Sequence, residues 1–521
     1  MTVSILTAEE AVAQIPDGAS VLFGGFVACV VPEELEFALG KRFLTTGSPR
    51  NLTVIYAAGQ GDGKARALNQ IAHEGLVKRV IGGHWGLVPK LQRLAVENRI
   101  EAYNLPQGII SHLCRDISAG KPGTLSKIGL RTFVDPRMGG GRINDITREE
   151  LIEVMELNGE EYLFYKKFSV DFALLRGTTA DENGNITMED EALTICNQVA
   201  AAACHNSGGR VIVQVKQIVE RGTIHPQMVK IPGIYVDAVV LCTDEKFHMQ
   251  TYDHYFDPRK VQQRKKCEPE IKEKPPSELD AKWIIARRAA LEMRKDTVVN
   301  FGIGTPEYVA KVALIEGFEN FYTATVEAGA IGGTPAGGLS FGTAIYPQAI
   351  VSQDYQFDFY DGGGLDQAFL GLAQADRQGH INVSKFGSRI AGCGGFINIS
   401  QSAKEVIFCG TFTAQGLDVS VADGRLLIRQ EGREKKFLRH VEQITFNGTY
   451  AWEQGKRVVY VTERAVFTLG SEGLILSEIA PGIDLKKDIL DQMNFQPEIS
   501  SSLKKMDQNI FSNKHLALGS S

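Results

Sequence analysis

Two stretches of the chain repeat each other at a constant spacing, and this repeat constrains the fold more than any other feature. DFALLRGTTADENGNI begins at Asp171 and DQAFLGLAQADRQGHI begins at Asp366, so matching aspartate, alanine, leucine, glycine and isoleucine residues lie 195 positions apart. The same register continues to VIVQV at 211–215 and VIFCG at 406–410. A repeat of this length is not a solenoid unit, and we interpret it as a duplicated α/β domain.

The two halves also begin alike. Thr7 opens a capping box and a helix, followed by the strand ASVLF, a Gly-Gly turn and a second helix that starts at Pro32. In the second half, a helix capped near Asp280 leads to the strand TVVNF, a Gly-Ile-Gly turn and a helix that starts at Pro306. Strands that alternate with helices predict open α/β domains with mostly parallel sheets, which bind ligands beyond the carboxyl ends of their strands.

The domain limits follow from these repeats and from a charged segment with a Pro-Pro pair between them. The length of 521 residues suits two or three compact domains. The second start lies about 275 residues after the first, so the first half must hold roughly 80 additional residues, which we place at about 110–165. We predict an N-terminal domain at 1–260, a linker at 261–278, a C-terminal domain at 279–500 and a C-terminal tail at 501–521.

Composition excludes several classes of function. The net charge of -6 offers no general basis for holding a nucleic-acid backbone. The eight cysteines are scattered without a Cys-x-x-Cys pair, which is typical of reduced thiols in the cytoplasm. No stretch of eighteen apolar residues occurs. We therefore expect a soluble cytoplasmic protein without a nucleic-acid or membrane partner.

Glu327 is the strongest candidate for a reactive residue. It follows the strand FYTATV, at the end where a parallel sheet holds its ligand, and no lysine or arginine lies within six residues of it. The glycines that follow, in AGAIGGTPAGG, allow a ligand to come close to the backbone. A turn carboxylate is the alternative interpretation, but an accessible and unpaired carboxylate can be a general base or a nucleophile.

Other motifs carry weaker signals. The clusters AGCGGF at 391–396 and FYDGGGLD at 359–366 could direct backbone N–H groups at an oxyanion, or could simply form tight turns. GLSFG around Ser340 matches the Gly-x-Ser-x-Gly pattern of serine hydrolases, but a strand before it and a helix after it are not predicted. His248, Asp253 and His254 lack a helical histidine pair, so we expect a solvated turn and no metal site.

Taken together, these strings resemble the family I coenzyme A transferases, and within them the single-chain acetate and propionate CoA-transferases. They are also similar to succinyl-CoA:3-ketoacid CoA-transferase. DGASVLFGGFVACVVP at 17–32 follows the first signature of the family, and TVEAGAIGGTP resembles its glutamate motif. NFGIGTP at 300–306 and GCGGFINI at 392–399 occur in the family's order, and the resemblance covers about 5–500.

The resemblance implies a role for each candidate residue. Glu327 is the nucleophile, and the reaction passes through an acyl-glutamyl anhydride and a glutamyl-CoA thioester. The oxyanion donors are the backbone N–H of Gly395 and the side-chain amide of Gln107, which places the active site between the two CoA-transferase-like domains. Coenzyme A is a substrate rather than a permanent cofactor, and its expected contacts are Gly302, Ile303, Gly304, Thr305, Gly394 and Gly395.

The resemblance also implies the reaction and the assembly. Coenzyme A passes from a short-chain acyl-CoA, such as acetyl- or propionyl-CoA, to a free carboxylic acid, in a homodimer or homotetramer. Two alternatives remain at this point. One is an acyl-CoA thioesterase that uses Ser340, and the other is a sugar-phosphate-binding regulator on a similar α/β fold.

Overall fold

The first half is built around a parallel sheet. The computed structural model describes residues 3–265, 273–516 and 518, and within them every neighbouring pair of strands in this eight-stranded sheet is parallel. The strand order is β1 (Ser4–Leu6), β13 (Ala238–Leu241), β11 (Arg210–Val215), β9 (Phe172–Arg176), β2 (Ser20–Phe23), β3 (Leu52–Tyr56), β4 (Val77–Gly82) and β5 (Glu101–Asn104).

The second half contains a ten-stranded sheet among the same described residues, and its centre, from β15 to β30, is parallel. Antiparallel pairs extend it on both sides, and the edge strand β33 pairs with β32 in parallel. The order is β19 (Ala349–Ile350), β16 (Ala330–Ile331), β15 (Tyr322–Thr325), β14 (Thr297–Phe301), β20 (Gln367–Gly371), β25 (Glu405–Cys409), β30 (Arg457–Val461), β31 (Ala465–Gly470), β32 (Gly473–Ile479) and β33 (Glu498–Lys505).

Helices cover both sheets. The first half has α1 (Ala8–Ala13), α2 (Glu33–Thr46), α3 (Pro89–Val96), α4 (Gln107–Ser118) and α5 (Asn197–Asn206). The second has α6 (Ala281–Ala290), α7 (Glu307–Ile315), α8 (Gln353–Phe359), a π-helical segment (Tyr360–Gly364), α9 (Phe396–Ser402) and α10 (Gly448–Glu453). Two-stranded ribbons pair β10 (Thr179–Asp181) with β12 (Gln217–Val219), β17 (Thr334–Pro335) with β18 (Ala344–Ile345), β21 (Gln374–Ala375) with β22 (Ile381–Asn382), β23 (Lys385–Phe386) with β24 (Arg389–Ile390), β26 (Thr413–Ala414) with β29 (Glu434–Lys435), and β27 (Asp418–Ala422) with β28 (Arg425–Gln430).

The predicted duplication is confirmed by equivalent hydrogen bonds in the two halves. The Asp171 carboxylate accepts the backbone N–H of Ser20 on β2 at 2.8 Å, and the Asp366 carboxylate accepts that of Val298 on β14 at 2.8 Å. Each aspartate thus ties the start of one strand to the next in the same way, because β9 and β20 are the two copies of one element. The α/β class and the mostly parallel sheets are confirmed as well.

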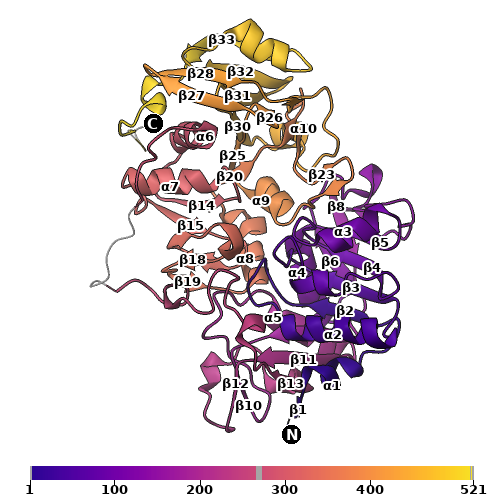
Figure 1. Ribbon diagram of the computed structural model, residues 1–521. Helices are drawn as coiled ribbons and strands as arrows, with labels where there is room; N and C mark the ends of the chain where they lie inside the picture. The colour runs from indigo at the N-terminus through magenta and orange to yellow at the C-terminus, as the bar shows by residue number, and fades with distance from the viewer. Residues whose placement is uncertain (1–2, 266–272, 517, 519–521) are drawn as a thin grey trace.

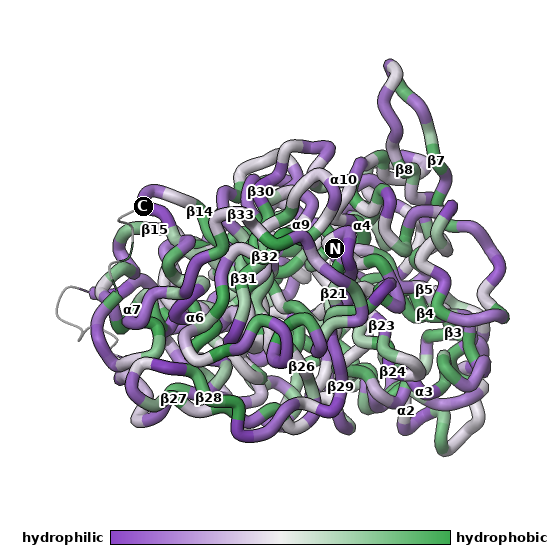
Figure 2. The backbone as a smooth tube through the Cα atoms, turned by 90° about the horizontal axis from the view of Figure 1, so that it is seen from above, coloured by the Kyte–Doolittle hydropathy of each residue, from purple (hydrophilic) through white to green (hydrophobic). Residues whose placement is uncertain are grey.

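The first half carries an additional small sheet between α4 and β9. It is antiparallel and consists of β6 (Gly123–Ser126), β8 (Glu160–Lys166) and β7 (Ile152–Leu157). Figure 2 shows β7 and β8 extending away from the body of the molecule. In the second half, only two residues separate the π-helical segment from β20.

Two predicted segments, a linker and a C-terminal tail, lie outside the two main domains. The domain limits remain a prediction, and residues 266–272 of the expected linker lie outside the described residues. The expected tail from residue 501 includes most of β33, and Ile510 and Phe511 are buried in the core of the second half. Within the described residues, no helix is both long and apolar enough to span a bilayer.

The two halves meet along α4, α8 and α9 (Figure 1). Cys393 and Ile397, next to and within α9, belong to the same hydrophobic cluster as the residues of α4 and α5. A further cluster joins Phe26 and Ala28 of the first half to Val326 and Ala328 of the second. The backbone on either side of Glu327 is therefore fixed by packing between the halves.

Candidate active site

A cavity of about 320 Å³ lies between the two halves. Its walls come from the carboxyl ends of β14, β15 and β20, which contribute Asn300, Glu327 and Leu370, and from first-half residues that include His84 and Gln107. Parallel sheets bind ligands at this edge, so the cavity lies where the fold class predicts it. Among the described residues that line it, none is a lysine or arginine.

Glu327 is buried in this cavity and forms no ion pair with any residue that the structure describes. Its exposed fraction is 7 %, and burial raises its pKa to about 7 because water no longer solvates the charge. Hydrogen bonds from its own backbone N–H and from the Asn300 side chain oppose this rise only in part. The carboxylate is therefore weakly solvated and close to its pKa at neutral pH.

A tight turn presents Glu327 to the cavity. The Gly329 N–H donates to the Val326 carbonyl at 2.9 Å, and Gly329 has a φ of 117°, which favours glycine. A Cβ at Gly329 would also lie 2.0 Å from the Val351 carbonyl oxygen. The glycine that follows the nucleophile candidate is thus required by backbone geometry as well as by room for a ligand.

Asn300 was missed by sequence reasoning and lies beside Glu327. Its Nδ2 donates to the Thr325 carbonyl at 3.2 Å and to the Tyr360 hydroxyl at 3.3 Å, and the Tyr360 hydroxyl donates to Thr325 Oγ1 at 2.9 Å. These bonds hold the Asn300 amide at the end of β14. The string NFGIGTP suggested a glycine turn, and its asparagine carried no signal of its own.

Gly395 and Gln107 each lie at the beginning of a helix, and both line the cavity that contains Glu327. Gly395 is the N-cap of α9, and a Cβ built on it would be 3.3 Å from Glu327 Cγ. No acceptor for the Gly395 N–H is found among the described residues. Gln107 is the first residue of α4, is 2 % exposed, and its Nε2 has no hydrogen-bond partner within the described structure. The structure thus places one unpartnered N–H donor next to the buried carboxylate and a second one in the wall of the same cavity.

The residues expected to contact coenzyme A are only partly brought together. Gly302, Ile303 and Gly394 line the cavity with Gly395, whereas Gly304 and Thr305 are not among its lining residues. The Gly304 N–H donates to the Glu307 carboxylate at 2.9 Å, at the N-terminus of α7. A phosphate could use this helix terminus only by displacing that carboxylate.

Cys393 and His84 also line the cavity. Burial and the charge of Arg389 lower the pKa of His84 to about 4, so its ring is neutral near neutral pH. Burial raises the pKa of the Cys393 thiol, whose Sγ donates to the Gly83 carbonyl at 3.8 Å. Neither group supplies a charge to the cavity.

Ser340 does not form a hydrolase site. It lies in a short 3-10 turn, is 6 % exposed and is not among the described residues that line the cavity. Its hydroxyl donates to Asp253 Oδ2 at 2.7 Å and accepts from Lys260 Nζ at 2.8 Å. The strand and helix that a nucleophile elbow needs are absent from this described segment, as expected.

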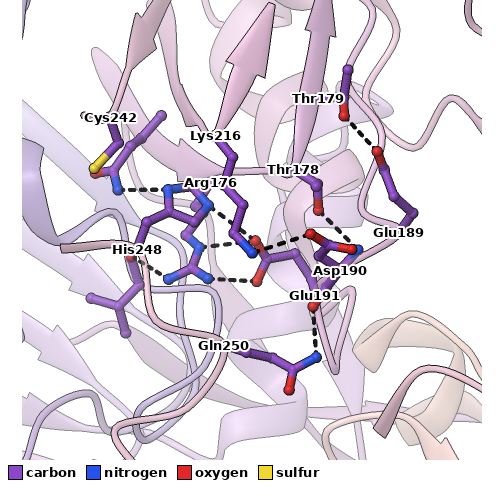
Figure 3. A network of polar contacts seen from close by, with 12 residues as sticks. Arg176, Thr178, Thr179, Glu189, Asp190, Glu191, Lys216, Cys242, His248 and Gln250 are labelled. Carbon is purple, nitrogen blue, oxygen red and sulfur yellow. Dashed lines mark hydrogen bonds and ion pairs between the residues drawn. The ribbon is translucent and has the colours of Figure 1, made fainter. Parts of the chain in front are cut away.

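The expected solvated turn around His248 is wrong for that residue, which is 2 % exposed and lies in a network of polar contacts with Arg176 and Glu191 (Figure 3). His248 Nε2 lies 3.3 Å from Glu191 Oε1, and Arg176 binds both oxygens of Glu191 at 3.0 and 2.9 Å. Burial and the charge of Arg176 lower the pKa of His248 to about 4, so the ring is neutral at neutral pH. No group of metal-ligating side chains occurs in the described part of the chain.

Glu191 is held as a carboxylate by this network. Burial alone raises its pKa, but the charge of Arg176 and the hydrogen bonds from His248 and Arg176 outweigh burial and lower it to about 2. Since His248 is neutral near neutral pH, Arg176 is the partner that balances the charge. Sequence spacing gave no signal for this cluster, whose members come from three separate segments.

Comparisons with known proteins show the family of the chain. The family model described as coenzyme A transferase matches residues 5–241. The chain is 46% identical over 514 residues to the caffeate CoA-transferase of Acetobacterium woodii, which covers 98% of this chain and 97% of that protein.

The chain belongs to the coenzyme A transferase family. It is 44% identical over 510 residues to acetate CoA-transferase YdiF of Escherichia coli (strain K12), covering 98% of this chain and 95% of the relative. It also matches the crystal structure of acyl-CoA transferase YdiF from E. coli O157:H7, a thioester complex with CoA, with a TM-score of 0.93 and 43% sequence identity. That match covers 100% of this chain and 98% of the other. The family resemblance found in the sequence is confirmed, and the chain is a transferase that moves coenzyme A between an acyl-CoA and a carboxylate.

Proposed function

We propose that the protein transfers coenzyme A from a short-chain acyl-CoA to a free carboxylic acid by a ping-pong mechanism in which Glu327 is the nucleophile. One observation supports this proposal above the others. Among the described residues, Glu327 is a buried carboxylate without an ion pair, the unpartnered N–H of Gly395 lies beside it, and the unpartnered amide of Gln107 lines the same cavity.

The first half-reaction breaks one thioester and makes another. A Glu327 oxygen attacks the thioester carbonyl carbon, the C–S bond breaks, and coenzyme A leaves as a thiolate from an acyl-glutamyl anhydride. The thiolate then attacks the glutamyl carbonyl, the anhydride C–O bond breaks, and the first acid departs as a carboxylate. The product on the enzyme is a glutamyl-CoA thioester.

The second half-reaction runs the same steps in reverse. The incoming carboxylate attacks the glutamyl carbonyl, the C–S bond breaks and the thiolate is released. The carboxylate and the glutamyl group now form a new anhydride. The thiolate attacks the acyl carbonyl of this anhydride, so a new acyl-CoA forms and Glu327 is restored. A carboxylate suits this task because the anhydride and the thioester both remain activated, whereas a serine ester would not.

The surroundings of Glu327 fit these steps. Each addition creates a tetrahedral oxyanion, and a preorganised donor is worth about 2.7–4 kcal/mol in such a site. The Gly395 N–H and the Gln107 amide are the donors in this proposal. Apolar walls that include Phe26, Phe341 and Leu370 keep water from the activated intermediates.

The substrate range is proposed as short-chain carboxylates of the acetate and propionate type. One relative is named for acetate and another for caffeate, so a panel of acceptors that spans this range is the informative measurement. One methylene changes discrimination by about 1–3 kcal/mol, and the panel should therefore resolve neighbouring homologues. We further propose a cytoplasmic homodimer or homotetramer, which light scattering can test.

Incubation with acetyl-CoA and propionate tests the function. Propionyl-CoA should appear with parallel lines in double-reciprocal plots, and little free thiol should be released. With acetyl-CoA alone, a Glu327 peptide should gain the mass of a CoA thioester. Glu327→Gln should abolish both signals, while Ser340→Ala should keep transfer. A Glu327→Gln protein that exchanges coenzyme A at the wild-type rate would contradict the proposal, and stoichiometric thiol release would indicate a thioesterase.

A further inference from the structure

Helix α4 begins at the active site without a cap from its own sequence. Its N-cap is Pro106, which has no polar side chain, and its first residue is Gln107. The first N–H groups of a helix have no partner within the helix and need acceptors from elsewhere. The acceptors for the first two N–H groups of α4 come from the other half of the chain. The Gln107 N–H donates to the Gly394 carbonyl at 2.9 Å, and the Gly108 N–H donates to Asn398 Oδ1 at 3.2 Å.

Asn398 is fixed in the orientation that this cap requires. It is fully buried within α9, and its Nδ2 donates to both oxygens of Asp361, at 2.9 and 3.2 Å. The amide cannot be turned over, because its nitrogen must face a carboxylate while its oxygen faces an N–H. Asp361 comes from the π-helical segment Tyr360–Gly364, so the glycine-rich string FYDGGGLD supplies the carboxylate that orients Asn398.

The approach of Asn398 to α4 depends on Gly108. A Cβ at Gly108 would lie 2.5 Å from Asn398 Nδ2 and 2.7 Å from Phe357 Cδ1. Glycine lowers the stability of a helix relative to alanine, so its presence in the first turn of α4 indicates a need for this contact. The two halves are therefore in contact at the residue next to Gln107.

We propose that Asn398, oriented by Asp361, is a positioning residue that caps α4 from the other half and thereby fixes the Gln107 amide against the oxyanion. The inference rests on the proposed function, in which Gln107 is an oxyanion donor. Gln107 Nε2 has no hydrogen-bond partner among the described residues, so its place depends on the backbone that carries it. A displacement of about 1 Å at a reacting centre can lower the rate about 100-fold.

Kinetics of Asn398→Ala test this role. We expect kcat to fall about 10- to 100-fold while KM for acetyl-CoA changes less than about twofold, because an oxyanion donor acts in the transition state. The matched control is Ser402→Ala, since Ser402 Oγ also donates to Asp361, at 3.2 Å, but does not reach α4. Its kcat should stay within about twofold of wild type.

A double-mutant cycle with Gln107→Ala separates positioning from general stability. If Asn398 acts through Gln107, Asn398→Ala should lower kcat less than about twofold once Gln107 is alanine. Asp361→Asn, which keeps an acceptor for Asn398 Nδ2, should retain more activity than Asp361→Ala. Fully multiplicative losses in the cycle, or a wild-type kcat for Asn398→Ala, would overturn the inference.

A second variant covers the case in which Asn398→Ala does not fold. Asn398→Leu keeps the approximate shape of the side chain, loses the acceptor for the Gly108 N–H, and should show the same loss in kcat and the same non-additivity. The Glu327 adduct of the wild-type protein separates a failure of the proposed function from a failure of the role of Asn398. If the wild type forms no adduct, the proposed function is wrong; if the adduct forms and the cycle is multiplicative, only the role of Asn398 is wrong.

Discussion

The two halves each bury a glutamate near the end of their sheet, and the two carboxylates behave in opposite ways. Glu191 in the first half is 2 % exposed with a pKa lowered to about 2, and Glu327 in the second is 7 % exposed with a pKa raised to about 7. Arg176, the partner of Glu191, occupies the repeat position of Gly371, which lines the cavity. Burial is similar, so the charge of Arg176 beside Glu191, which has no counterpart among the described residues around Glu327, accounts for the opposite directions of the two pKa shifts.

The two shifts have opposite effects on stability. Glu191 has a lower pKa in the folded state than in the unfolded chain, so it stabilises the protein above about pH 4.5, and this contribution is lost as the pH falls toward 2. Glu327 has a higher pKa when folded, so the folded state binds more protons between about pH 4.5 and 7. Its contribution to stability therefore decreases as the pH rises through that interval.

Substitution of Glu327, the glutamate of the second half, should have the largest effect on activity. Glu327→Gln removes the only group proposed to form the covalent intermediates, so we expect transfer from acetyl-CoA to propionate to fall by more than about 10⁴-fold. The assay is propionyl-CoA formation, and a melting curve that matches or exceeds wild type serves as the control for folding. Residual transfer activity above about one per cent of wild type would show that a residue other than Glu327 forms the covalent intermediates.

Exchange of the first-half glutamate should instead affect stability. Glu191→Gln leaves the Arg176 guanidinium buried without its counter-charge, which costs about 3–5 kcal/mol in the free energy of unfolding. Denaturant unfolding at pH 7 measures the change. The double variant Arg176→Met with Glu191→Met should lose less than Glu191→Gln alone; an equal or greater loss would show that packing rather than the unpaired charge is responsible.

The same stability measurement on Glu327→Gln should give a change of the opposite sign. At pH 8 the wild type holds a desolvated carboxylate whose pKa is raised by burial, and removing this charge should stabilise the fold by about 3 kcal/mol. Below about pH 4.5 the glutamate is protonated in both states, so the gain should disappear. A gain that does not depend on pH would contradict the assigned pKa.

The smallest effect is the pH dependence of the wild-type rate. Attack requires the ionised form of Glu327, so kcat/KM should rise about tenfold per pH unit below about pH 7 and level off above it. Initial rates at subsaturating acetyl-CoA between pH 5 and 9 give the profile. A flat profile through pH 6–8 would mean that the free enzyme does not hold Glu327 near this pKa.

Sequence alone predicted the duplicated α/β fold because the repeat consists of continuous stretches of matching residues. Asp171 and Asp366 fixed the register, and the glycines after Glu327 marked the turn that presents it. The family resemblance, rather than spacing, brought in Gly395, which lies next to the carboxylate, and Gln107, which lines the same cavity. The assignment of their roles remains a proposal.

What the sequence did not reveal depends on contacts between distant segments. Arg176, Glu191 and His248 meet only after folding, and the neighbours of His248 in sequence suggested solvent exposure. Asn300 is one polar residue at a strand end, and only its place beside Glu327 distinguishes it. Such pairings need three-dimensional coordinates because no local period or spacing encodes them.

The buried thiol at Cys393 has a consequence for chemical selectivity. In the proposed mechanism a coenzyme thiolate is released next to an activated acyl group, in a cavity whose wall already contains a sulfur atom. A second thiolate there would compete for the acyl group and trap it as a dead-end protein thioester. Because burial keeps Cys393 protonated, the described residues of the cavity wall supply no thiolate, and the nucleophilic sulfur comes from the substrate. The same dry environment that raises the pKa of Glu327 thus protects the intermediate from the protein itself.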